Sequence, residues 1–179
     1  ALNSIAEEQT AIFAGGCFWC TESDFEKLDG VISAASGYIG GQLKNPTYKQ
    51  VSAGGSGHTE AVEVVFDDQA VSYAELVEYF WKTIDPTDAG GQFCDRGQQY
   101  RSEIFYQTES QRSIAEASKK ALAASGLLAS AIATKITAAS TFYPAEEYHQ
   151  DYYLKNSIRY NYYRWGCGRD KRLAELWGK

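Results

Sequence analysis

The sequence predicts an α+β fold: a two-layer α/β sandwich with a C-terminal helix and coil extension. Its 179 residues are the length of one ordinary domain, so we expect a single domain spanning 1–179. The 44% hydrophobic and 22% charged residues are typical of a globular chain. Apolar patterns recur in the order strand, helix, strand, strand, helix, strand. This βαββαβ core predicts the ferredoxin-like plait, with helices on one face of a sheet.

The N-terminal half contains the first four of these elements. Residues 10–14 are a short apolar run that stops at a glycine pair, which is typical of a buried strand. Residues 17–28 have apolar side chains at helical spacing and acidic residues early, which predicts a helix. Residues 31–38 and 60–66 are predicted strands. The glycine-rich stretch 40–59 between them is a long loop, and such loops are usually functional.

The C-terminal half begins with a clear helix signal. Ser72 is placed to cap a helix over 73–83, and Glu75 completes a capping box. After it we expect a loop, a strand, a helix and a strand, at 87–99, 102–106, 109–125 and 132–137. A tyrosine-rich tail follows.

Charge and hydropathy exclude two classes of partner. The longest stretch without a charged or strongly polar side chain is Ala11–Trp19, far short of the ~20 residues of a bilayer span, so we expect no membrane partner. The net charge is −6, yet residues 155–179 hold seven basic and two acidic residues. We interpret this as a basic tail docked on its own acidic body, and we expect no nucleic acid.

The N-terminus lacks a basic region followed by an apolar one. We therefore expect a cytoplasmic protein, and leave open a periplasmic or organellar location after removal of a leader.

A reactive cysteine pair is the strongest chemical signal. The chain has four Cys and no Met, and Cys17 and Cys20 lie in the run Gly-Gly-Cys-Phe-Trp-Cys, where a strand turns into a helix. The positive end of the helix dipole should lower the pKa of the Cys17 thiol, and C-x-x-C at a helix start is typical of a redox pair. A zinc site would need a second close pair of ligands. We predict redox or nucleophilic chemistry without a metal or cofactor.

Two aromatic residues stand between the cysteines. Phe18 and Trp19 form an apolar platform suited to a methyl or thioether group. Core packing accounts equally well for Phe18, whereas its neighbour Trp19 should point toward a cleft.

Seven segments together resemble the peptide methionine sulfoxide reductase A family, in the same order, from about residue 12 to 153. They are GGCFWC, SGYIGG, NPTY, SGHTEAVEV, DPTD, GQQYRS and FYPAEEYHQDY. The resemblance implies a single catalytic domain with an α/β sandwich fold. It also implies a peptide-methionine (S)-S-oxide reductase that repairs oxidative damage. The substrates would be oxidised proteins and free methionine sulfoxide, and the reductant would be thioredoxin or a similar dithiol.

The resemblance also assigns roles. Cys17 would attack the sulfoxide sulfur and become a sulfenic acid. Glu60, kept protonated by partial burial, would donate the proton that the leaving oxygen needs. Tyr48 and Tyr100 would donate hydrogen bonds to that oxygen, and Asp95 would keep the site polar and hydrated. From the residues alone, Glu60 merely begins a strand and would be read as solvated.

The same resemblance makes Phe18 and Trp19 the pocket for the substrate methyl group. It leaves the resolving cysteine open, because Cys20 stands where the commonest family pattern has Gly. Cys20 is nearest in sequence, and Cys167 has the flanking glycines expected of a mobile resolving residue. Cys94, on the same loop as Asp95, is the third candidate. Our hypothesis is that Cys20 resolves first and that Cys167 relays the disulfide outward.

Two other functions remain open. A thioredoxin-like disulfide oxidoreductase would need a proline facing the C-x-x-C pair, but the three prolines lie in loop or turn contexts. A binding module that uses the tyrosine-rich tail is the non-enzymatic alternative. His58 and His149 are interpreted as structural hydrogen-bonding residues.

Overall fold

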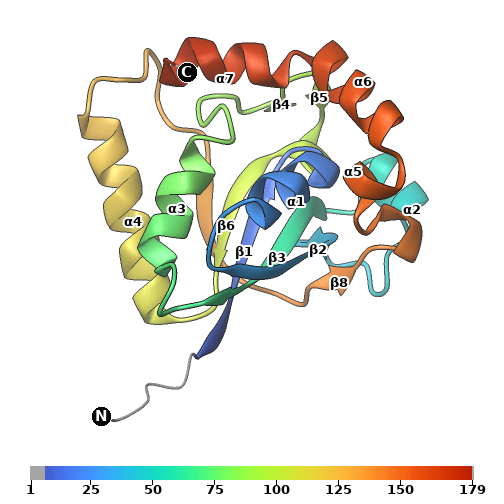
Figure 1. The fold of residues 1–179 in the computed structure, drawn as a ribbon, viewed down its shortest axis with the longest axis horizontal. Coiled ribbons are helices and arrows are strands. Elements are labelled where there is room, and N and C mark those ends of the chain that lie inside the picture. Colours follow the sequence, from blue (N-terminus) through green and yellow to red (C-terminus); the bar gives the residue numbers. More distant parts are fainter. Residues whose placement is uncertain (1–6, 179) are drawn as a thin grey trace.

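The sheet at the centre of the molecule has six strands. The computed structural model describes residues 7–178, so the ends of the expected 1–179 domain, including most of the stretch searched for a leader, lie outside the described residues. The strand order is β7-β6-β1-β3-β2-β8 (Figure 1). The bounds are β1 Glu8–Gly15, β2 Val31–Ile39, β3 Thr59–Asp67, β6 Ser102–Tyr106, β7 Lys135–Ala138 and β8 Tyr143–Pro144.

The inner four strands follow one another in space as β6-β1-β3-β2, and each is antiparallel to its neighbours. Two helices, α1 (Phe18–Glu26) and α3 (Tyr73–Trp81), make the crossovers. A further helix, α4 (Glu109–Ala124), connects β6 to the parallel strand β7. The α+β class predicted from the sequence is confirmed.

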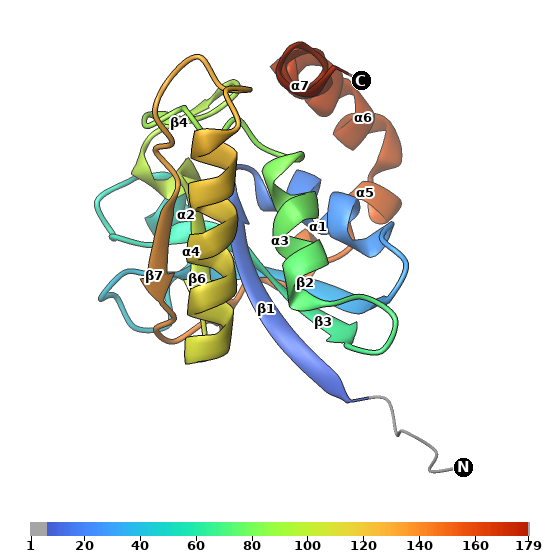
Figure 2. The same ribbon diagram turned by 90° about the vertical axis from the view of Figure 1, so that its left-hand side faces the viewer.

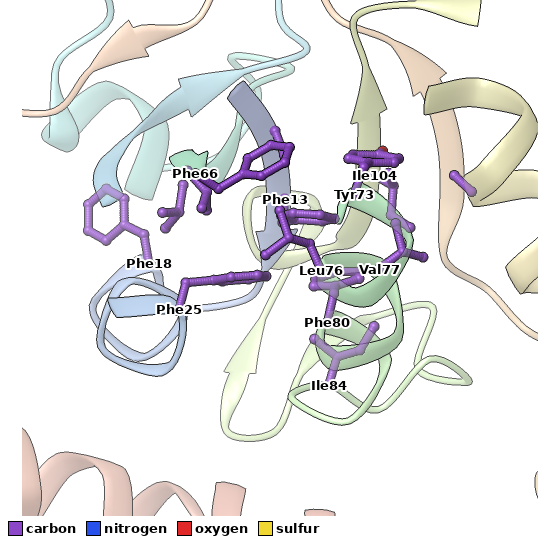
Figure 3. Close-up of a cluster of buried hydrophobic side chains, with 14 of the residues drawn as sticks. Phe13, Phe18, Phe25, Phe66, Tyr73, Leu76, Val77, Phe80, Ile84 and Ile104 are labelled. Carbon is purple, nitrogen blue, oxygen red and sulfur yellow. The ribbon is translucent and has the colours of Figure 1, made fainter. Parts of the chain in front are cut away.

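One face of the sheet carries the main core. Phe13 of β1 is completely buried and its ring packs against those of Phe25 from α1 and Phe80 from α3, each with a ring-centroid distance of 4.9 Å (Figure 3). Helix α4 stands beside α3 at the β6–β7 edge (Figure 2). The alternate residues of β1 point to the other face, where Ile12 packs with Phe105 and, from the chain after β7, with Phe142. The helices therefore cover one face, as expected.

The two predicted loops contain short elements that were not predicted. The loop 40–59 contains helix α2 (Tyr48–Ser52), which begins with a capping box between Thr47 and Gln50. The loop 87–99 contains a small hairpin of β4 (Gly91–Gln92) and β5 (Asp95–Arg96), followed by the 3-10 helix η1 (Gln98–Tyr100). These elements are too short to show a hydrophobic period, and tertiary contacts stabilise them.

The predicted strand 132–137 begins late. Residues 132–134 lie outside the ladder because Ala133 and Thr134 donate backbone hydrogen bonds to Pro86 instead, and the Thr134 hydroxyl bonds to Ser102. Only from Lys135 does the chain pair with β6.

The C-terminal tail is more regular than the expected helix and coil. The 3-10 helix η2 (Glu147–His149) precedes α5 (Tyr152–Lys155), α6 (Ser157–Cys167) and α7 (Arg169–Trp177). The last two run across the end of the sheet where α1 begins (Figure 1).

Salt bridges from Arg164 to Asp24 and from Arg172 to Asp85, each 2.8 Å, hold the basic tail to the acidic body, as predicted. Arg169 is fully buried and donates to the backbone carbonyls of Gly15 (2.7 Å) and Thr83 (3.1 Å). Within residues 7–178, none of the helices combines the length and the apolar character that a bilayer crossing requires.

The stacked position of Phe13 leads to a stability prediction. Phe13→Ala should lower the free energy of unfolding by about 3–5 kcal/mol, because the site lies between two helices and cannot collapse. Ile32→Ala removes an apolar side chain that is 52% exposed and should change the free energy of unfolding by less than about 0.5 kcal/mol. Urea denaturation followed by circular dichroism measures both. An equal loss of unfolding free energy in the two variants would contradict the assignment of this core.

Candidate active site

The cysteine pair lies at the junction between β1 and α1. Gly16 has φ +86°, and a Cβ there would lie 2.6 Å from the Cβ of Gln92, so only glycine fits this turn. Cys17 is the N-cap residue of α1, and Cys20 follows one turn later. Both are free thiols, 6% and 1% exposed.

A cavity of about 60 Å³ opens beside Cys17. Its lining comes from α1, α2, β3, β5, η1 and α6, and consists of Cys17, Phe18, Trp19, Tyr48, Glu60, Asp95, Tyr100 and Tyr163. The first seven are all of the residues predicted as catalytic or substrate-binding. Phe18 is both a core residue, 1% exposed, and part of the cavity wall, so the two interpretations of it hold together.

Glu60 is buried against the start of α1. It is 2% exposed, and its Oε2 accepts a hydrogen bond of 2.9 Å from the backbone N–H of Phe18. Burial raises the pKa of Glu60 to about 8, although the bond from Phe18 lowers it, and the charge of Asp95 raises it further. The solvated position expected from the residues alone is wrong. With this pKa the carboxyl group keeps its proton at neutral pH and is able to donate it.

The pKa values of the two thiols are shifted in opposite directions, which the sequence did not predict. Burial raises the pKa of Cys17 well above its ordinary value, and the hydrogen bond to Cys20 and the charges of Glu60 and Asp95 add to the rise. The hydrogen bond from Cys17 lowers the pKa of Cys20 to about 7, with a contribution from the positive charge of Arg169. The expectation of a lowered pKa at Cys17 is therefore wrong, because desolvation beside two carboxyl groups outweighs the helix dipole.

Two phenols complete the polar side of the cavity. Burial raises the pKa of Tyr48 to about 12 and also raises that of Tyr100, so both hydroxyls keep their protons and can donate. Tyr48 begins α2, and its backbone N–H donates to Glu146 (3.0 Å). Tyr100 ends η1. Both stand on loop segments, as expected for site residues.

The hairpin that carries Asp95 is fastened to the tail at three successive residues. The pairs are Phe93–Arg169, a cation–π contact of 4.7 Å, Cys94–Cys167, a disulfide, and Asp95–Tyr163, a hydrogen bond in which the phenol donates. Burial raises the pKa of Asp95, and the bond from Tyr163 opposes the rise. Sequence reasoning singled out neither Tyr163 nor the Cys94–Cys167 pairing, because the contacts join positions 68 and 73 residues apart.

Both histidines are structural hydrogen-bonding residues, as predicted. His58 accepts from the backbone N–H of Gly41 (3.1 Å), and its other nitrogen lies 2.7 Å from the carbonyl of Leu43. His149 accepts from the indole N–H of Trp19 (3.0 Å).

The site therefore combines a nucleophilic sulfur, a protonated carboxyl group and two phenol donors around a small cavity with aromatic walls. Such a set of groups can attack an electrophilic atom, protonate the oxygen that leaves it and pass the oxidation to a second thiol. Fold and site together define a cysteine-dependent oxidoreductase.

Known proteins identify the family within that class. A profile of the peptide methionine sulfoxide reductase family matches residues 9–179. Peptide methionine sulfoxide reductase MsrA of Bacillus licheniformis is 50% identical over 173 residues, which cover 97% of this chain and 96% of that protein. MsrA of Ligilactobacillus salivarius is 55% identical over 170 residues, covering 95% and 98%.

Solved structures agree. The crystal structure of reduced Mxr1 from Saccharomyces cerevisiae has a TM-score of 0.77 and 31% identity, and the match covers 84% of this chain and 87% of that one. This chain belongs to the peptide methionine sulfoxide reductase A family.

The raised pKa of Glu60 makes stability depend on pH. Between its ordinary value of 4.5 and about 8, folded Glu60 keeps a proton that the unfolded chain has lost, so a rise in pH favours unfolding. From about pH 5 to 8 the wild type should lose up to about 4 kcal/mol of unfolding free energy more than Glu60→Gln loses. Denaturant titrations at a series of pH values measure this, and parallel curves for the two proteins would contradict it. Glu22, with a pKa of about 7, contributes to both curves and cancels in the comparison.

Proposed function

We propose that this protein is a peptide-methionine (S)-S-oxide reductase, which reduces methionine S-sulfoxide, free and in oxidised proteins, to methionine. Thioredoxin or a similar dithiol supplies the electrons. The observation that carries the proposal is the convergence of seven residues, from five separate segments of the chain, on the cavity beside Cys17. Family membership supports the same activity.

In the proposed first step Cys17 attacks the sulfoxide sulfur. Its hydrogen bond to Cys20 provides an acceptor for the thiol proton as the attack proceeds. Glu60 protonates the sulfoxide oxygen, and the phenols of Tyr48 and Tyr100 donate hydrogen bonds to it. The oxygen passes to Cys17, which becomes a sulfenic acid, and methionine leaves. The substrate is reduced by two electrons and Cys17 is oxidised by two.

The aromatic side chains of Phe18 and Trp19 hold the methyl group of the substrate in this proposal, and Asp95 keeps the opposite wall polar. Sulfur lies well against aromatic rings, which suits a methyl sulfoxide. The cavity volume of about 60 Å³ matches a small group rather than a large side chain.

Recycling needs a second thiol and then an external reductant. Cys20, one turn along α1, attacks the sulfenic acid, and a Cys17–Cys20 disulfide forms with loss of water. Both residues are buried, whereas Cys94 is exposed. We propose that reduced Cys94 and Cys167 exchange with the buried disulfide and become the Cys94–Cys167 disulfide, which the external dithiol reduces.

Peptide mapping tests whether the Cys17–Cys20 disulfide forms first. Wild type, fully reduced and then given one equivalent of substrate without reductant, should yield peptides joined through Cys17 or through the relay pair. Cys94→Ser/Cys167→Ser, which cannot relay, should stop at the Cys17–Cys20 link. In Cys20→Ser, methionine should still be released once, with a sulfenic acid trapped on Cys17. Absence of any Cys17–Cys20 link in the relay-deficient variant would rule out Cys20 as the resolving residue.

The proposed acid predicts a pH profile. The single-turnover rate of the wild type should fall as pH rises through about 8, because Glu60 loses the proton that it must donate. Glu60→Gln should be slower by about 10²–10⁴-fold and should lack this fall. Rapid-quench measurement of methionine released from the S epimer tests both.

A matched control is Glu63→Gln, on the same strand but outside the cavity, which should keep the wild-type rate and profile. The R epimer serves as the substrate control. A Glu60→Gln variant with the wild-type pH profile would remove Glu60 from the role of acid.

We also propose a cytoplasmic location. Cytosolic conditions keep dithiol reductants reduced, and the proposed catalytic cycle starts from reduced thiols. Cell fractionation with an antibody against the chain tests this.

A further inference from the structure

A short segment of the tail, residues 146–151, supports the cavity from behind. Two of its polar residues bond to α2 and β2. The carboxylate of Glu146 accepts from the backbone N–H of Tyr48 (3.0 Å) and from the hydroxyl of Tyr38 (3.0 Å). Gln150 bonds to both backbone groups of Ser36, each at 2.9 Å. The segment is therefore held rigidly between α2 and β2.

His149 occupies the middle of this segment with an incomplete set of hydrogen bonds. Its ring is 1% exposed and is enclosed by the rings of Phe18, Tyr48 and Tyr148, with centroids 5.0, 4.3 and 4.1 Å away. Because Nδ1 accepts the indole N–H of Trp19, the neutral ring carries its proton on Nε2. Nε2 has no hydrogen-bond partner among the described residues. A buried donor without a partner costs stability, so its presence calls for a reason.

The reason lies in how Trp19 is held. One face of the indole stacks on Tyr152, with ring centroids 3.8 Å apart and planes at 7°, and Tyr163 meets it edge-on at 5.8 Å. Stacking fixes the plane of a ring but leaves it free to slide and turn within that plane. The hydrogen bond from Nε1 to His149 removes that freedom. Without this bond the wall of the cavity would have to be ordered each time a substrate binds.

We propose that His149 is a positioning residue for substrate binding, acting through Trp19. It touches neither the substrate nor the reacting atoms, since it does not line the cavity. The proposal rests on the proposed function, because the position of Trp19 matters only if the cavity takes the methyl group of a sulfoxide. Loss of the acceptor at Nδ1 raises KM and leaves kcat nearly unchanged.

The informative substitution is His149→Phe. Phenylalanine keeps a planar ring in the enclosure, removes the acceptor for Trp19 and also removes the unpartnered N–H, so the fold should be retained. With free methionine S-sulfoxide as substrate and dithiothreitol as reductant, KM should rise about tenfold and kcat should stay within about twofold. His149→Asn, whose side-chain oxygen can take the place of Nδ1, should restore most of the affinity.

Two controls separate positioning from general damage. Ser118→Ala removes the acceptor of the Trp81 indole N–H (2.8 Å), a bond of the same kind outside the cavity, and should leave KM unchanged. In a Trp19→Phe background, which has no indole N–H, His149→Phe should cause no further rise in KM. Fluorescence anisotropy of Trp19, taken as the difference from Trp19→Phe, should fall in His149→Phe because the ring turns more freely.

Two results would overturn the positioning role of His149. An unchanged KM in His149→Phe, or the same tenfold rise in the Trp19→Phe background, would overturn the proposal, and a loss confined to kcat would place His149 in the chemical step instead. Should His149→Phe fail to fold, His149→Leu and His149→Asn carry the same comparison. A wild type that does not reduce the S epimer would overturn the proposed function itself, which is a separate result.

Discussion

The carboxyl group of Glu60, buried where α1 begins, is the constraint on which the rest of the site depends. Its hydrogen bond with the N–H of Phe18 joins a central strand to the first turn of α1 and places the acid beside Cys17. The burial that keeps Glu60 protonated also makes a thiolate on Cys17 costly. The hydrogen bond between the two thiols adds to that cost at Cys17 and favours the negative charge on Cys20 instead, whose pKa it lowers to about 7. Acid and nucleophile are thus tuned by one desolvated environment.

The C-terminal tail completes the cavity that the sheet and the first helices only partly enclose. Tyr163 supplies one wall of the cavity, and three consecutive contacts hold the tail to the hairpin that carries Asp95. Arg169 anchors α7 to the carbonyl of Gly15, next to the turn that presents Cys17. His149 orients Trp19 from behind. A tail read from sequence as a basic, tyrosine-rich extension is therefore part of the site, since its polar groups are bonded to the elements that carry the reacting groups.

Prediction succeeded where the controlling interactions are local. The capping box of Ser72 and Glu75 places the start of α3 correctly, and α2 begins with a local signal of the same kind at Thr47 and Gln50. Pocket residues were predicted through resemblance to a family rather than through their own patterns. Tyr163 was missed because a cluster of tyrosines does not show which of them faces inward until the phase of the helix is known.

The sequence by itself determined the order of the βαββαβ elements, the strand-to-helix junction at Cys17 and the type of chemistry that two thiols at a helix start can perform. Only the tertiary structure decided the burial of Glu60, the protonation of the Cys17–Cys20 pair and the pairing of Cys94 with Cys167. The physical reason is the separation along the chain over which each interaction acts. Periodicity and capping act over a few residues along the chain, whereas desolvation, charge and disulfide geometry depend on distances between residues that meet only after folding.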